Sequence, residues 1–107
     1  MSKRYEVKFY VGTGFDQSGV AIQSAPALIE LAERKLCEYF GGGTVYQHTG
    51  LWQDFVGPVV KEPGITLVSV VTEDQLSNVR PVAVYLRSLF NQNCVLVTRS
   101  EVFAEFI

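Results

Sequence analysis

Polar and apolar residues alternate strictly over residues 4–11, which is typical of a strand with one buried face. Tyr5, Val7, Phe9 and Val11 share one side of this predicted strand. A loop then leads to a second pattern, in which apolar residues recur at helical spacing up to Phe40.

The limits of this first helix are marked by local signals. Ser24 is a suitable N-cap, and Pro26 falls in the first turn, where the missing N–H costs nothing. Gly41 is the expected C-terminal stop because glycine readily adopts the left-handed cap conformation. The pattern therefore predicts a helix between Ser24 and Gly41.

Glycine and β-forming residues dominate the middle of the chain, where six of the nine glycines fall within residues 41–64. We expect a strand over 44–49, a bulge or bend at Gly50, and a turn region over 54–64. Residues 65–71 are rich in β-branched side chains and predict a further strand.

The last third begins with a capping-box sequence, Thr72 to Gln75, followed by a short turn at 73–77 and a helix from about residue 78. Residues 94–98 predict the fourth strand, and the apolar tail 102–107 predicts a fifth, short one. The length of 107 residues suits one domain, residues 1–107. The order strand–helix–strand–strand–helix–strand predicts an α+β, ferredoxin-like βαββαβ sandwich with two helices on one face of an antiparallel sheet.

Composition narrows the class of partner and compartment. The net charge is −2, which disfavours a dedicated nucleic-acid binder because such proteins carry a basic excess. The chain has neither an apolar run long enough to span a membrane nor the pattern of a signal peptide, so we expect a cytoplasmic protein. Cys37 and Cys94 lie in apolar segments and are expected to be reduced and buried. With His48 as the sole histidine and no CxxC spacing, we expect no metal and no cofactor.

Two places in the sequence are candidates for ligand binding. Gly12, Thr13 and Gly14 precede the first helix, where backbone N–H groups can hold an anion; the alternative is an ordinary loop. His48 and Trp52 flank Gly50, near Asp54 and Glu62. A histidine with a carboxylate partner can transfer protons, and His with Trp suits a stacking pocket; the alternative is packing on a sheet face.

A four-stranded sheet with helices on one side leaves its second face bare, and this face is expected to carry apolar side chains. The candidates are Tyr10, Tyr46, His48, Val68, Val70, Leu96 and Phe103. Covering them with another copy favours a homo-oligomer, with a dimer as the commonest form; the alternative is that the tail folds back over them.

Several short motifs carry a resemblance to a known group. They are Gly42-Gly43-Thr44-Val45, Gly50-Leu51-Trp52, Glu62 before a strand, and the segment 90–97. In these the chain resembles an uncharacterised family of small bacterial and phage ferredoxin-like proteins, which supports the fold and implies no activity.

Two functions are consistent with these observations. We expect a non-catalytic binding protein, of phage type, that holds a small anionic or aromatic, nucleotide-like ligand or a protein partner. The contacts are expected from Gly12, Thr13, Gly14, His48 and Trp52. The alternative is a small cofactor-free enzyme that uses His48 with a carboxylate for acid–base chemistry.

Overall fold

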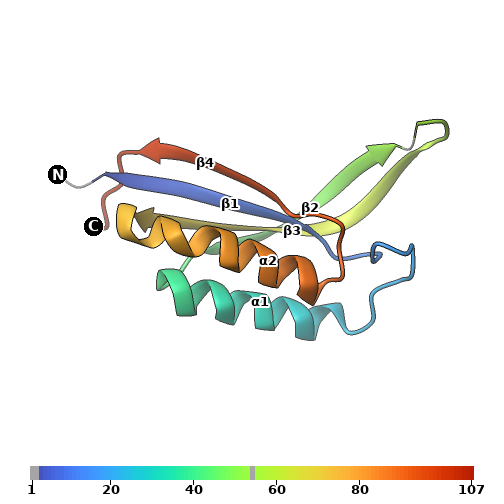
Figure 1. Cartoon of the computed structure of the whole chain (residues 1–107), viewed down its shortest axis with the longest axis horizontal. Helices are drawn as coiled ribbons and strands as arrows, with labels where there is room; N and C mark the ends of the chain where they lie inside the picture. The colour runs from blue at the N-terminus through green and yellow to red at the C-terminus, as the bar shows by residue number, and fades with distance from the viewer. Residues whose placement is uncertain (1–2, 54) are drawn as a thin grey trace.

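The computed structural model describes residues 3–53 and 55–107, and its four strands form one antiparallel sheet (Figure 1). The elements in chain order are β1 (Arg4–Gly12), α1 (Ala25–Phe40), β2 (Thr44–Gln53), β3 (Val59–Thr72), the 3₁₀ helix η1 (Glu73–Asn78), α2 (Val79–Leu89) and β4 (Leu96–Val102).

The strand order is β2-β3-β1-β4, and both long helices lie on one side of the sheet (Figure 1). In each strand–helix–strand half, one strand of the other half lies between the two strands: β3 lies between β1 and β2, and β1 lies between β3 and β4. The predicted α+β, ferredoxin-like architecture is therefore confirmed.

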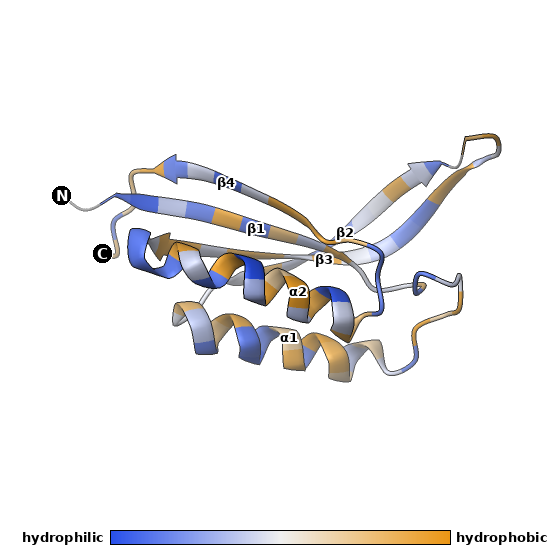
Figure 2. Cartoon of the chain, viewed as in Figure 1, coloured by the Kyte–Doolittle hydropathy of each residue, from blue (hydrophilic) through white to orange (hydrophobic). Residues whose placement is uncertain are grey.

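The core lies between the sheet and the helices. Val7, Phe9 and Val11 are fully buried on the helix side of β1, as the alternation predicts. Leu36 of α1 and Leu86 of α2 pack against this side, and apolar positions of both helices face the sheet (Figure 2). The opposite side of the sheet carries no helix and is called the open face below.

The helix boundaries agree with the sequence signals. Ser24 and Gly41 are the N-cap and C-cap of α1, and Gly41 has a φ of 83°, the left-handed conformation that favours glycine. The capping box between Thr72 and Gln75 is present at the start of η1, where the Thr72 N–H donates to the Gln75 side-chain oxygen at 2.9 Å.

The prediction for residues 50–64 is wrong in two respects. Gly50 makes no bulge, because β2 pairs in one continuous register with β3 from Thr44 to Gln53. β3 begins at Val59 and includes Pro63, where a turn was expected. The Pro63 carbonyl accepts a hydrogen bond from the Thr13 N–H at 2.9 Å, where β1 has already ended. The missing N–H of proline faces the same way as its carbonyl, so no bond to β2 is lost.

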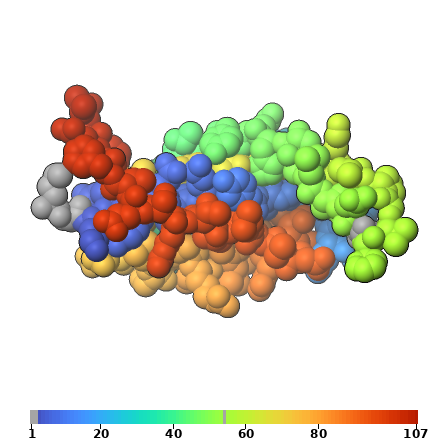
Figure 3. All heavy atoms as spheres, turned by 90° about the horizontal axis from the view of Figure 1, so that it is seen from above, coloured from blue at the N-terminus to red at the C-terminus, as the bar shows by residue number. Residues whose placement is uncertain are grey.

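The C-terminal prediction also needs correction. β4 starts at Leu96 instead of residue 94, and residues 103–107 form no fifth strand. Phe103 and Phe106 are largely exposed, and the tail projects from one end of the sheet (Figure 3). Phe106 nevertheless lines a shallow hollow together with Val68 and Val70, so the tail reaches only the margin of the open face.

Both cysteines are free thiols, but the expectation that they are buried is wrong. Cys37 and Cys94 are exposed. Cys37 follows the buried Leu36 on α1, one position round the helix and away from the sheet. Cys94 lies in the connection before β4, outside the alternating pattern that the strand imposes.

Candidate functional site

One row of residues crosses three strands on the open face, near the end where the β2–β3 hairpin extends beyond the helices (Figure 1). His48 of β2 lies opposite Gly64 of β3, and Gly64 lies opposite Gly12 of β1. Two of the predicted site residues, His48 and Gly12, are thus brought into the same row although they are far apart in the sequence.

The imidazole ring of His48 is held in one place. Its Nδ1 lies 2.8 Å from the hydroxyl oxygen of Thr66, which is fully buried. A Cβ built on Gly64 would collide with His48 Nε2, so the ring lies directly over the Gly64 backbone. The Tyr10 ring is beside it, with 6.1 Å between centroids. Because Thr66 occupies Nδ1, Nε2 is the ring nitrogen without a hydrogen-bond partner among the described residues.

The Glu62 side chain leans across the sheet toward the loop that follows β1. Its Oε1 accepts a hydrogen bond from the Phe15 N–H at 3.1 Å, and a Cβ on Gly12 would lie 2.7 Å from the same oxygen. Gln92 fixes the other side of this loop by donating to the Phe15 carbonyl at 2.7 Å. The loop therefore positions a carboxylate of the protein itself.

A pocket of about 590 Å³ lies at this end of the sheet, on the side that carries the helices. Its wall includes Ile29 of α1 together with Thr13 and Lys61, which continue the odd-numbered, core-side positions of β1 and β3. The His48 and Glu62 side chains project to the open face instead, where they occupy diagonal positions of β2 and β3. A histidine beside a carboxylate is a pair that can bind a polar molecule and transfer a proton.

The predicted site residues are only partly brought together. Gly12 and His48 share one row of the open face, whereas Thr13 lines the pocket on the helix side and Gly14 packs against Pro63. Trp52 lies four residues farther along β2 on the same face, opposite Val60, and is about half exposed. It does not contribute to the pocket wall. Asp54 lies outside the described residues.

The sequence analysis missed Thr66 and Gly64, which hold the His48 ring. The signal was the alternation itself. Residues of β3 that face away from the core have even numbers, so Thr66 and Gly64 share the open face with Val68 and Val70. The pairing of β2 with β3 was needed to show which of them meets His48.

A second polar cluster lies on the open face, at the middle of β1. The phenol groups of Tyr10 and Tyr46 and the Glu6 carboxylate raise the pKa of Lys8 above its ordinary value. Tyr10, Tyr46, His48, Val68, Val70 and Leu96 all occupy open-face positions, as expected, whereas Phe103 lies beyond the end of β4.

The described residues contain neither a metal-binding cluster nor a membrane-spanning helix. Among residues 3–53 and 55–107, no cluster of three His, Cys, Asp or Glu side chains has the arrangement of a metal site. Within the same ranges, no helix is both long enough and apolar enough to span a membrane.

Comparison with known proteins identifies the fold. No protein-family profile matches the sequence, and no curated protein matches it. Among solved structures, the chain is similar to a phage SAM lyase in complex with S-methyl-5′-thioadenosine, at 14% identity and a TM-score of 0.72, over 94% of this chain and 83% of that one.

Two further structures are similar. An apo phage SAM lyase has 14% identity and a TM-score of 0.67, over 98% of this chain and 93% of that chain. CutA from Synechococcus elongatus PCC7942 has 10% identity and a TM-score of 0.64, over 95% of this chain and 79% of that chain. At these identities the similarity establishes the fold alone, a small ferredoxin-like fold also found in a phage protein.

These findings correct the expected function. A non-catalytic binding protein was expected, but the phage structures that share the fold are those of an enzyme. The similarity therefore favours the alternative interpretation, a small enzyme, over a non-catalytic binding protein.

Proposed function

We propose that this protein is a small cofactor-free enzyme of phage type that cleaves a carbon–sulfur bond in a sulfonium nucleoside such as S-adenosylmethionine. The observation that carries the proposal is that the His48 and Glu62 side chains are diagonal neighbours on the open face, His48 of β2 opposite Gly64 and Glu62 two residues before Gly64 on β3. The similarity in fold to a phage SAM lyase supports the choice of substrate, because S-methyl-5′-thioadenosine is what remains after S-adenosylmethionine loses its four-carbon amino acid group.

His48 is assigned the role of general base. Histidine suits this role because it exchanges protons near neutral pH. Thr66 fixes the ring through Nδ1 and Gly64 lets it lie flat, so Nε2 is held in a constant position. A base that is held in place loses less entropy when the substrate reacts.

Glu62 is assigned the role of electrostatic partner. A sulfonium group carries a fixed positive charge, which a carboxylate held beside it attracts. The neighbouring Tyr10 ring offers a π face to the same charge or to the adenine ring. The Gly12–Gly14 loop forms the wall that holds Glu62, and Trp52 extends the surface along β2.

The proposed step is an elimination. His48 Nε2 takes a proton from the four-carbon amino acid group, at the carbon next to the one bonded to sulfur. The electron pair of that C–H bond forms a carbon–carbon double bond. The electron pair of the bond between this group and sulfur stays with sulfur, which leaves as a neutral thioether. Positive charge moves from sulfur to the imidazole, beside Glu62, and the proton then passes to water. The leaving group is neutral and needs no general acid.

The test compares turnover of S-adenosylmethionine by wild type, His48→Gln and Glu62→Gln. We expect His48→Gln to lower kcat by about 100-fold or more, the range for loss of a general base. Glu33→Gln is the matched control, because Glu33 is an exposed carboxylate on α1 outside the pocket. Unchanged kcat in His48→Gln, with the fold intact by circular dichroism, would exclude the assigned proton transfer.

Two expectations accompany this function. We propose that the chain is a homo-oligomer, with a dimer favoured, because apolar and aromatic residues such as Tyr46 and Leu96 are exposed on the open face. We also propose a cytoplasmic location, where a nucleoside substrate of this kind is available.

A further inference from the structure

We propose that two copies of this chain pair through the free edge of β4, antiparallel and centred on Ser100, to form a two-fold symmetric dimer. β4 is the last strand of the sheet order, so one side of its backbone has no strand partner within residues 3–53 and 55–107. Such an edge is a ready template for another strand. The inference deepens the oligomer proposed above and does not depend on the proposed activity.

The charge pattern of β4 is complementary to itself. Arg99 and Glu101 flank Ser100 and point to the same side of the sheet, because both are odd-numbered positions of one strand. In a two-fold pair centred on Ser100, the Arg99 of each copy lies opposite the Glu101 of the other. Opposite charges directly across an antiparallel pair are stabilising, and the symmetry supplies two such pairs.

Neighbouring registers lose this match. A pair centred on Arg99 would place two guanidinium groups opposite each other, which is unfavourable. A pair centred on Thr98 would place Arg99 opposite Val97, and Glu101 opposite Val95. Only the Ser100 register joins both charges of each copy to an opposite charge, so charge selects it.

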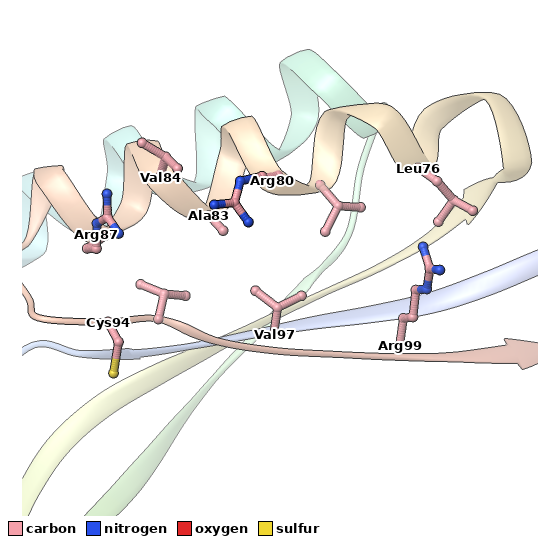
Figure 4. Close-up of a pocket in the computed structure, with 10 residues that line it drawn as sticks. Leu76, Arg80, Ala83, Val84, Arg87, Cys94, Val97 and Arg99 are labelled. Carbon is pink, nitrogen blue, oxygen red and sulfur yellow. The ribbon is translucent and has the colours of Figure 1, made fainter.

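The surface next to this edge has groups to receive the partner. A groove of about 410 Å³ runs between α2 and β4 (Figure 4), with an apolar floor that includes Ala83 and Val97. Arg80, Arg87 and Arg99 line it, and no carboxylate does. No ion pair to these three arginines occurs among the described residues. The groove is therefore basic in a chain whose net charge is −2.

The tail that follows β4 has the matching chemistry. Its direction, however, keeps it out of the interface. Phe106 lines a hollow with Val68 and Val70 of its own β3, which lies across β1 from β4, so residues 103–107 turn away from the free edge and do not continue the register. The proposed interface is therefore confined to β4, with the Glu101 of each copy meeting the Arg99 of the other at the margin of the basic groove.

The dimer would join two four-stranded sheets into one, with the helices of both copies on the same side. β2 is at the opposite edge of the sheet from β4, so the His48 and Glu62 site of each copy remains uncovered. The arrangement is closed by its two-fold axis and does not grow into a fibre.

Sedimentation equilibrium of four samples tests the interface: wild type, Arg99→Glu, Glu101→Arg, and an equimolar mixture of the two variants. We expect wild type at twice the 11.9 kDa chain mass. Each single variant places like charges opposite each other, and association should weaken about tenfold or more. In the mixture every pair is again of opposite sign, so a heterodimer should form.

Arg34→Glu and Glu33→Arg are the matched controls, because they change the net charge equally on the exposed side of α1. A monomeric wild type would overturn both the oligomer and the interface. An oligomer of another size, or one that the single variants leave unchanged, would overturn the interface alone. Circular dichroism shows whether each variant is folded, and heterodimer formation confirms it for both.

Discussion

The position of His48 depends on a residue without a side chain. A Cβ at Gly64 would collide with His48 Nε2 and would lie 2.7 Å from the Val11 carbonyl oxygen. The histidine ring can turn away, but the backbone oxygen of a central strand cannot. The absence of a side chain at Gly64 therefore allows both the close approach of β1 to β3 and the position of the His48 ring.

Gly64→Ala should accordingly lower the free energy of unfolding by about 1–3 kcal/mol, the range for overpacking a buried site. Urea unfolding measures the change. Gly42→Ala is the control, because nothing lies within 4 Å of a Cβ at Gly42, and it should leave stability nearly unchanged. Equal stability of the two variants would show that the ring and strand adjust freely.

The exposure of both thiols predicts rapid alkylation. Cys37 and Cys94 should react with iodoacetamide in native protein at nearly the rate seen in denatured protein, because no packing excludes the reagent. The sulfur of Cys94 points away from the groove between α2 and β4 (Figure 4). Mass spectrometry at timed intervals follows both sites. Strong protection of either thiol in the folded state would contradict its exposed placement.

At the scale of elements, the regular patterns predicted most of the fold, whereas the glycine- and proline-rich segment 50–64 was predicted wrongly. The alternation in β1 and the caps of α1 depend only on neighbours in the sequence, so they could be predicted. The place of Pro63 inside β3 could not be predicted, because it depends on where β1 ends. The missing N–H of Pro63 faces the side of β1, and the pairing of β1 with β3 ends at Gly64. The partners of His48 belong to other strands, and only the register of β2 with β3 identifies Thr66 and Gly64.

The capping box at η1 joins β3 to α2 and makes a prediction at the same scale. Gln75→Ala removes the acceptor of the Thr72 N–H and should destabilise the fold by about 1 kcal/mol. Thermal unfolding measures it. Gln23→Ala is the control in an exposed loop, where no side-chain hydrogen bond is made among the described residues. A loss equal to that of the control would mean that water replaces the cap without cost.

For the whole molecule, the tail is expected to matter little for either stability or association. Removing residues 103–107 should change the unfolding temperature little, because Phe103, Phe106 and Ile107 are mostly exposed in the single chain. The same truncation should leave dimer formation unchanged, since the tail turns away from the free edge of β4. Calorimetry and sedimentation on one sample measure both effects. A large loss of association would contradict an interface confined to β4.

Because the molecule is small, its proposed activity can be tested directly. One open-face site with one histidine and one adjacent carboxylate is assigned the whole reaction, with no cofactor. Purified protein incubated with S-adenosylmethionine alone, followed by liquid chromatography and mass spectrometry, measures the products. The account predicts S-methyl-5′-thioadenosine in amounts that rise with time and with enzyme concentration, and that fall about 100-fold in His48→Gln. Formation of no more product than in buffer, by protein shown to be folded, would contradict it.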